Sequence, residues 1–206
     1  MKQTEQKQNN PNPWLQIWLH PKQTIAQMDE KFNFLTYLLI WFLGLHIALN
    51  FAQEVHSGNF KSLGFILGIS LVRAIFYGAV VWFVYSALAY WIGKLFGGTG
   101  TWRKMRHAMA WAQVPMLGYL ILYWPLGLIV FGHDLFTSVD VTLSAGKMML
   151  NMLVLVINLV LGIWYIFIVS NAIAGAHRIS GWKGFFTFLV LIFVLVLAAI
   201  GLTAIA

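Results

Sequence analysis

Five long apolar stretches constrain this chain more than any other feature of its sequence. They cover residues 33–52, 63–93, 108–131, 149–170 and 185–206. A helix of about 20 apolar residues crosses the hydrocarbon core of a bilayer, and a helix satisfies its own backbone polar groups in lipid. Only 9% of the residues are charged, against about 25% in soluble domains. We therefore predict an all-α integral membrane protein whose residues 33–206 form a bundle of five transmembrane helices.

The third stretch is the least regular, because it contains Gln113, Pro115 and Pro125. Proline removes a backbone donor and kinks a helix, but neighbouring helices in a membrane bundle can satisfy the carbonyl that it frees. We therefore predict a single kinked helix over residues 108–131. The alternative is a re-entrant pair of short helices broken near Pro125.

The basic residues outside the apolar stretches predict the orientation of the chain. Ten of them fall on one side: Lys2, Lys7, Lys22, Lys31, Lys94, Arg103, Lys104, Arg106, Arg178 and Lys183. Only Lys61 and Lys147 fall on the other. Cytoplasmic loops are enriched in Lys and Arg, so we predict a cytoplasmic N-terminus and an extracytoplasmic C-terminus. The same rule accounts for the net charge of +7, and we expect the lipid bilayer, not nucleic acid, as a partner.

The residues before the first span divide into two parts. We expect residues 1–12 to form a disordered cytoplasmic tail and residues 13–32 to form two short amphipathic helices. Their apolar residues recur at helical spacing on either side of Pro21. They are Trp14, Ile17, Trp18, Ile25 and Met28. This face could lie in the headgroup layer, with the tryptophans as interfacial anchors, or it could pack on the bundle.

Arg73 is the one charged residue inside an apolar stretch. A charge within the membrane marks a functional site by default, and a guanidinium in such a site would suit a phosphate ligand. However, Arg73 lies 21 residues before Lys94, which is about 31 Å of helix and matches the thickness of the hydrocarbon core. Arg73 is thus either an interfacial anchor that snorkels to the headgroups or a paired or ligand-binding residue.

Two further patterns concern contacts between helices. Asn151 and Asn158 are seven residues apart and share one helical face, where they could bond to neighbouring helices or line a polar conduit. Gly64 and Gly68 are four residues apart, a spacing that favours close helix packing.

The chain offers little that could support catalysis. It has no cysteine, its histidines have no spacing typical of metal ligands, and its six acidic residues lie outside the predicted spans. Residues 97–101 are glycine-rich but lack the Lys-Ser/Thr of a phosphate-binding loop. We therefore expect no enzyme activity, no metal and no other cofactor.

Two segments on the predicted cytoplasmic side resemble the Yip domain family of polytopic membrane proteins. In the first, residues 97–102, which begin with Gly97 and Gly98, lead into a run of small residues over 106–115 that ends in Pro115. In the second, a helix bearing Trp164 ends in residues 175–183, which contain His177 and Arg178. The resemblance implies five membrane helices and a cytoplasmic N-terminus.

The short region before the first span resembles the bacterial branch of that family more than the eukaryotic members, which have a long cytosolic tail and bind prenylated small GTPases. The resemblance therefore implies a bacterial cell membrane. It also points to an accessory component of an ABC-type export or toxic-peptide-resistance system. With catalytic residues lacking, we predict a non-catalytic protein that binds other membrane proteins or itself. The alternatives are a transporter of small molecules or lipid carriers, and a membrane-shaping or lipid-sensing protein. Arg73, Asn151, Asn158, His177 and Arg178 are the candidate ligand or partner residues.

The orientation can be tested with a reporter fused after Ala206. Five spans and a cytoplasmic N-terminus predict that alkaline phosphatase at this position is active outside the cytoplasm, whereas a green fluorescent reporter is dark there. A C-terminal fusion that reports a cytoplasmic position would rule out the predicted number of spans.

Overall fold

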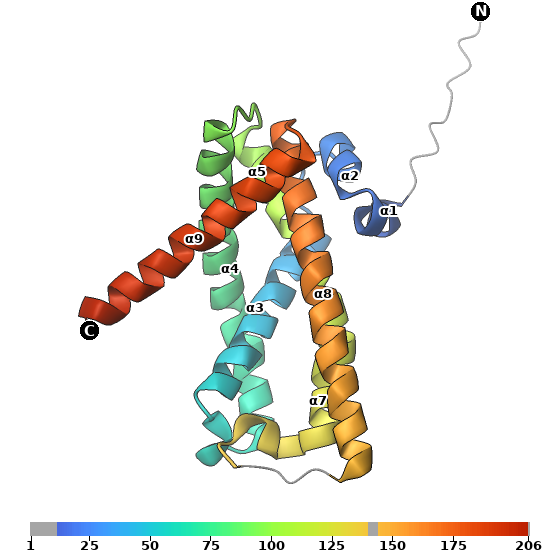
Figure 1. Ribbon diagram of the computed structural model, residues 1–206, viewed down its shortest axis with the longest axis vertical. Helices are drawn as coiled ribbons and strands as arrows, with labels where there is room; N and C mark the ends of the chain where they lie inside the picture. Colours follow the sequence, from blue (N-terminus) through green and yellow to red (C-terminus); the bar gives the residue numbers. More distant parts are fainter. Residues whose placement is uncertain (1–11, 140–143, 206) are drawn as a thin grey trace, which may run out of the picture.

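The computed structural model describes residues 12–139 and 144–205. The tail predicted for residues 1–12 lies, except for Asn12, outside the described residues. The helices run in this order: α1 Pro13–Leu19, α2 Pro21–Gln27, α3 Phe34–Glu54, η1 Ser57–Asn59, α4 Leu63–Leu95, α5 Trp102–Trp111, α6 Met116–Gly118, η2 Tyr119–Tyr123, α7 Trp124–Phe131, η3 Gly132–Phe136, α8 Ala145–His177 and α9 Gly181–Ile205. In Figure 1, α1, α2 and α5 lie at one end of the bundle, called here the N-terminal end. The opposite end is called the far end.

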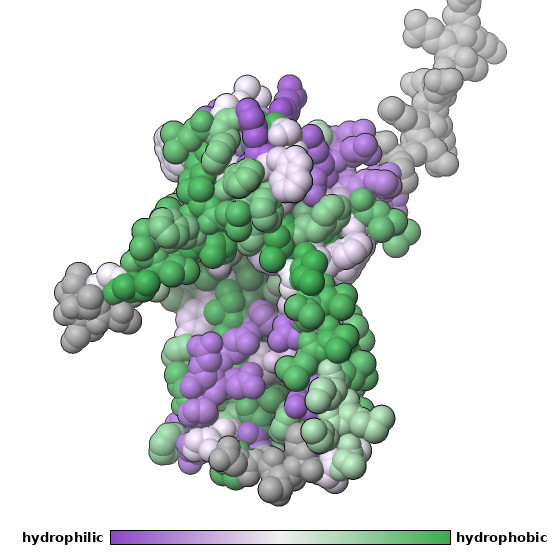
Figure 2. Space-filling view, viewed as in Figure 1, coloured by the Kyte–Doolittle hydropathy of each residue, from purple (hydrophilic) through white to green (hydrophobic). Residues whose placement is uncertain are grey.

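The prediction of five membrane helices is confirmed. Five segments of the described chain are long and apolar enough to cross a membrane: Phe34–Glu54, Leu63–Leu95, Trp102–Phe136, Ala145–His177 and Gly181–Gly201. Their outward surfaces are rich in apolar side chains, which Figure 2 shows along α8 and α9. Helices α4 and α8 each have 33 residues, or about 50 Å at 1.5 Å per residue. Both exceed a hydrocarbon core of about 30 Å, so they tilt or extend beyond it.

Helices α3 and α4 form an antiparallel hairpin that is held at two glycines. A Cβ atom at Gly44 would lie 1.9 Å from the carbonyl oxygen of Ala74, and one at Gly78 would lie 2.3 Å from that of Ile40. The two backbones therefore touch directly. The sequence led us to expect close packing at Gly64 and Gly68 instead, and that prediction is wrong within this chain. Nothing lies within 4 Å of a Cβ atom at either position.

The third span is one interrupted helix, as predicted, and Figure 1 shows it running from α5 at the N-terminal end to α7 at the far end. Its main break lies at residues 112–115, upstream of Pro125, where the re-entrant alternative placed it. Pro115 has no N–H to continue the α-helical pattern, and the Gln113 amide donates to the carbonyl of Met109 (2.9 Å). A π-helical turn over Tyr119–Tyr123 precedes Pro125. Such a turn accommodates backbone groups that proline leaves out of register.

Helix α9 crosses the bundle obliquely. It packs against α8 at Gly184, where a Cβ atom would lie 2.2 Å from the carbonyl oxygen of Ser170. Figure 1 shows that its C-terminal half then leaves the bundle. At the far end, η1 and η3 form a closing layer in which Phe136 is fully buried and stacks on Trp124 (6.1 Å between ring centroids).

The glycine contact between α3 and α4 is testable by replacement of Gly44 with alanine. The added methyl group must push the two backbones apart, which we expect to destabilise the protein by about 1–3 kcal/mol. Thermal or denaturant unfolding in detergent micelles measures the change. Gly68→Ala is the matched control on α4 and should leave stability unchanged or slightly raised. Equal losses from both variants would contradict the assignment.

Candidate functional site

The two N-terminal helices pack on the bundle. Ile17 of α1 and Ile25 of α2 are fully buried, and the Trp14 ring lies 5.1 Å from the Trp111 ring of α5. Helix α2 crosses α8 at Gly175, where a Cβ atom would lie 2.5 Å from the carbonyl oxygen of Lys22. The sequence left open whether the apolar face of these helices lies in the headgroup layer or packs on the bundle. In the structure this face packs on the bundle.

The other residues of this face, Trp18 and Met28, are half-buried and pack against the same core. The opposite side of α1 exposes Leu15 (72%) and Leu19 (65%). The α1–α2 pair thus has apolar residues on both sides, and only one of the two sides is covered by protein.

An extended segment, Met28–Asn33, leads from α2 to α3 and is held by α5. The Lys104 ammonium donates to the carbonyl of Met28, and the Thr101 hydroxyl donates to the Glu30 carboxylate (3.3 Å). The Phe32 ring meets His107 edge-on, with 5.6 Å between ring centroids. The segment therefore has a defined path over the N-terminal end of the bundle.

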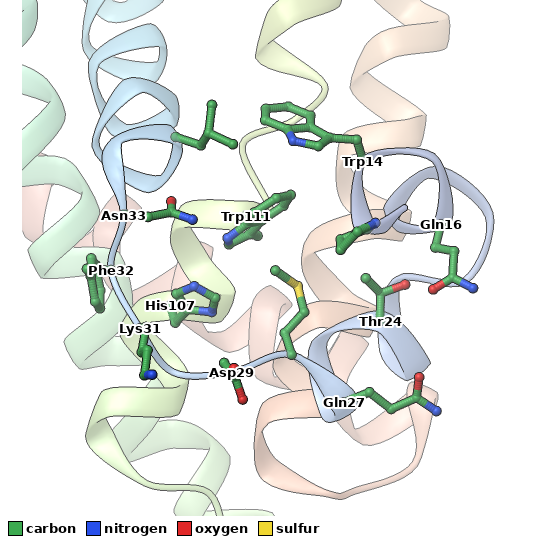
Figure 3. Close-up of a pocket in the computed structure, with 13 residues that line it drawn as sticks. Trp14, Gln16, Thr24, Gln27, Asp29, Lys31, Phe32, Asn33, His107 and Trp111 are labelled. Atoms are coloured by element: carbon green, nitrogen blue, oxygen red, sulfur yellow. The ribbon is translucent and has the colours of Figure 1, made fainter. Parts of the chain in front are cut away.

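A cavity of about 700 Å³ lies between α1, α2, this segment and α5 (Figure 3). Its walls combine aromatic and aliphatic side chains with several polar ones. They are Pro13, Trp14, Gln16, Thr24, Gln27, Met28, Asp29, Lys31, Phe32, Asn33, Leu35, His107 and Trp111. Binding pockets for organic ligands have about this volume and this mainly apolar character. We call it the N-terminal cavity.

Two polar atoms in the wall of the N-terminal cavity have no partner in the described chain. His107 is only 2% exposed and Trp111 only 3%, yet His107 Nδ1 and Trp111 Nε1 make no hydrogen bond. Buried polar groups are nearly always paired, because an unpaired one costs about 1–3 kcal/mol. His107 and Trp111 are four residues apart on α5, so they share a helical face. Sequence reasoning missed both, although that spacing was a usable signal.

The wall of the N-terminal cavity offers few ionisable or free hydroxyl groups. Asp29 is its only carboxylate, and the Thr24 hydroxyl already donates to the carbonyl of His20 (2.8 Å). No group of three or more His, Cys, Asp or Glu side chains in the described ranges could hold a metal ion. The unpaired Trp111 indole N–H and His107 Nδ1 are buried within this wall.

The two segments that carry the family resemblance meet beside the N-terminal cavity, around His177. The His177 ring is fully buried and stacks on Tyr90, and its Nε2 donates to the carbonyl of Ala89 (3.2 Å). A Cβ atom at Gly93 would lie 2.3 Å from this ring, and one at Gly98 would lie 2.4 Å from it. The Thr99 backbone N–H donates to the carbonyl of His177 (3.0 Å). We call the packing of α4, residues 97–99 and α8 around this ring the His177 junction.

Helices α4 and α8, which meet at the His177 junction, are each followed by a residue with a left-handed backbone conformation. Gly97 (φ 85°) ends α4, and the Gly98 N–H bonds back to the carbonyl of Gly93 (2.9 Å), as in a Schellman motif. Arg178 (φ 58°) ends α8 in the same way, and its side chain is exposed. The structure thus brings Gly97, Gly98 and His177 together, whereas Pro115 lies at the break in the third span.

The remaining predicted residues lie apart from this end. Arg73 is exposed on α4 and forms no ion pair with another described residue. Asn151 lines a separate cavity of about 370 Å³ at the far end, with Gln53, Tyr123 and Asp134 among its neighbours. Asn158 lies two turns along α8, where its carbonyl accepts from the Tyr119 hydroxyl (3.3 Å). Arg73 and the asparagines therefore do not form one site.

A polar cluster that sequence reasoning missed lies between α3 and α7. The Trp124 indole N–H donates to His46 Nδ1 (3.2 Å), and the Asn50 amide lies 3.0 Å from His46 Nε2. The Tyr119 ring packs 4.6 Å from the His46 ring. Figure 2 shows hydrophilic side chains on the face below α9, beside α8. The cluster ties α3 to the interrupted third span by hydrogen bonds within the membrane part of the bundle.

Five candidate spans under a layer of short helices define a multi-pass helical membrane protein. The family model of the Yip1 domain matches residues 15–203, so the chain belongs to the Yip1 family. The family prediction from the two sequence segments is thereby confirmed. A search of curated proteins and a search of solved structures each found no match.

The close contact at the His177 junction predicts that Gly93 and His177 are energetically coupled in the stability of the protein. Gly93→Ala should destabilise the protein, because the three atoms nearest to its methyl group would all belong to the His177 ring. His177→Ala should also destabilise it, but the double variant should lose less than the sum, since the methyl group then has room. We expect a coupling of about 0.5–3 kcal/mol in unfolding measurements in detergent. Additive losses would show that the two residues do not restrain each other.

Proposed function

We propose that the protein is a non-catalytic adaptor that holds a segment of another membrane protein in the N-terminal cavity. In this proposal it serves as an accessory component of an ABC-type export or toxic-peptide-resistance system in a bacterial cell membrane, with its N-terminus and this cavity on the cytoplasmic side. One observation carries the proposal: the cavity is lined by aromatic and polar side chains, and two buried polar atoms of its lining residues lack partners in the described chain.

The chemistry of the N-terminal cavity supports a peptide as ligand. A peptide group offers a carbonyl oxygen that can accept from Trp111 Nε1–H and an N–H that can donate to His107 Nδ1. Trp14 and Phe32 supply aromatic surface of the kind that dominates binding energy at protein interfaces. A partner segment would bury apolar side chains against these rings, and it would reach the two unpaired atoms, which are buried in the wall, when the His107 and Trp111 side chains turn toward it.

The positive charge around this end supports the cytoplasmic placement. Five basic residues belong to the parts of α4, α5 and α9 that lie at the N-terminal end of the bundle: Lys94, Arg103, Lys104, Arg106 and Lys183. Cytoplasmic surfaces of membrane proteins are enriched in such residues.

A transporter is the second candidate, favoured by the far-end cavity and the polar cluster around His46. Intramembrane polar groups beside an interrupted helix are typical of substrate sites in transporters. It ranks lower because Arg73, the one cation within the predicted spans, lies on the outer surface of α4 and lines neither cavity.

The adaptor proposal can be tested by photo-crosslinking in native membranes. A photoreactive residue at Gln16, which lines the N-terminal cavity, should form an adduct with a membrane protein that mass spectrometry identifies as an export component. Trp111→Phe removes the indole N–H together with part of the ring and should lower the adduct yield about tenfold, the equivalent of roughly 1.4 kcal/mol.

The control is the same photoreactive residue at Gln23, an exposed glutamine of α2 that does not line the N-terminal cavity. Equal adduct yields from Gln16 and Gln23 would contradict the proposal. So would adducts that contain lipid alone.

A further inference from the structure

On the other side of the Met28–Asn33 segment lies a groove of about 470 Å³ that the adaptor proposal does not use. It is lined by Glu30, Lys31, Phe32, Tyr37, Trp82, Arg103 and Arg106. Three of these residues are cations and one is an anion, so the groove has an excess of two positive charges. We call it the basic groove.

The cations of the basic groove are not neutralised by the protein. The Glu30 carboxylate accepts from the Thr101 hydroxyl, and neither arginine forms an ion pair with a described residue. Arg106 is held between aromatic rings, with its guanidinium carbon 5.7 Å from the Phe32 centroid and 5.3 Å from the Trp102 centroid. Its Nε is buried without a hydrogen-bond partner. Arg106 is therefore fixed in position while its capacity to donate remains unused.

Aromatic residues that line the basic groove restrain Arg106. The Trp82 indole N–H donates to the backbone carbonyl of Arg106 (2.9 Å), and the Phe32 ring lies 5.7 Å from the Trp82 ring. Phe32 also contacts Tyr37 (5.9 Å between ring centroids). This aromatic support limits the motion of the guanidinium, so less conformational entropy is lost when it binds an anion.

The basic groove opens where the first membrane helix begins. Phe34, the first residue of α3, is 77% exposed, and Tyr37, one turn further, is 61% exposed. Phe83 of α4 is also exposed and packs against Trp102. An apolar surface of this kind directly beside unpaired arginines matches a molecule with a phosphate group at one end and acyl chains at the other.

We propose that the basic groove binds an anionic phospholipid, with Arg103 and Arg106 on its phosphate and its acyl chains along the exposed surface of α3 and α4. Guanidinium groups bind phosphate oxygens through paired, charge-assisted hydrogen bonds. Lys31 adds a third positive charge that favours a lipid with net negative charge over a zwitterionic one. The site differs from ordinary snorkelling because its arginines converge on one groove and Arg106 is fixed there by aromatic rings.

Native mass spectrometry of the detergent-purified full-length protein, titrated with phosphatidylglycerol or phosphatidylcholine, tests the site. The wild-type protein should retain phosphatidylglycerol in preference to phosphatidylcholine. Arg103→Gln combined with Arg106→Gln should weaken the retention of phosphatidylglycerol at least about tenfold. Arg106→Lys should give an intermediate loss, because lysine keeps the charge but cannot bond in a bidentate manner.

Lys94→Gln is the matched control, since it removes one positive charge at the same end of the bundle but outside the basic groove. It should bind phosphatidylglycerol as the wild type does. Arg103 is exposed, so Arg103→Gln alone carries the test if the double variant unfolds, as judged by its thermal unfolding.

Three outcomes would overturn the proposal. In the first, all variants bind phosphatidylglycerol equally, which would mean general attraction to a basic surface. In the second, inorganic phosphate or glycerol phosphate at millimolar concentration displaces the lipid, which would assign the groove to a soluble phosphate ligand. In the third, the wild type does not distinguish the two lipids.

Discussion

Glycine residues let three helices approach the C-terminal part of α8 so closely that the glycine positions have no room for a Cβ atom. Gly93 and Gly98 hold the His177 ring, Gly175 admits the backbone of α2, and Gly184 brings α9 onto Ser170. In lipid there is little hydrophobic gain from bringing apolar helices together, so close packing and buried hydrogen bonds must supply the stability. The N-terminal end of the bundle depends on these contacts, because they fix α2, α4 and α9 relative to α8.

Both candidate binding sites follow from the position of α2. With α2 fixed on α8, the Met28–Asn33 segment must pass over α5 to reach the start of α3, and Lys104 and Thr101 hold it there. This path leaves the N-terminal cavity on one side and the basic groove on the other. Lys31 and Phe32 line both. The two sites therefore share a wall, and the residues of that wall belong to the segment between α2 and α3, not to a membrane helix.

The sequence predicted the membrane helices well because the physical signal is strong. A stretch such as residues 149–170 has no reasonable alternative to a helix in lipid. The sequence also predicted the apolar face of Ile17 and Ile25, but it could not show what covers that face. Helical periodicity is the same whether a helix packs on lipid or on protein. The prediction for Gly64 and Gly68 failed for a related reason, because the spacing of small residues permits close packing but does not identify the partner. In α4 the close contact with α3 lies at Gly78 instead.

The candidate sites were harder to predict, because their residues come from segments far apart in the chain. His107 and Trp111 follow the glycine-rich loop, and only the folded chain sets them opposite Trp14 and Asn33. Arg103 and Arg106 counted in the sequence as two of ten basic residues that orient the chain. Their convergence with Lys31 became visible only in three dimensions.

The residues that maintain the fold differ from the residues that line the two candidate sites. The segments that identify the family use their distinctive residues internally: His177 is buried against glycine, and Gly97 and Arg178 end helices. None of these three lines the N-terminal cavity or the basic groove. Arg106, His107 and Trp111 of α5 do line these sites, and each has a buried donor or acceptor without a partner, as His177 Nδ1 also has. If the family framework only positions α5, then proteins that share it can bind different partners by changing the residues on this one short helix.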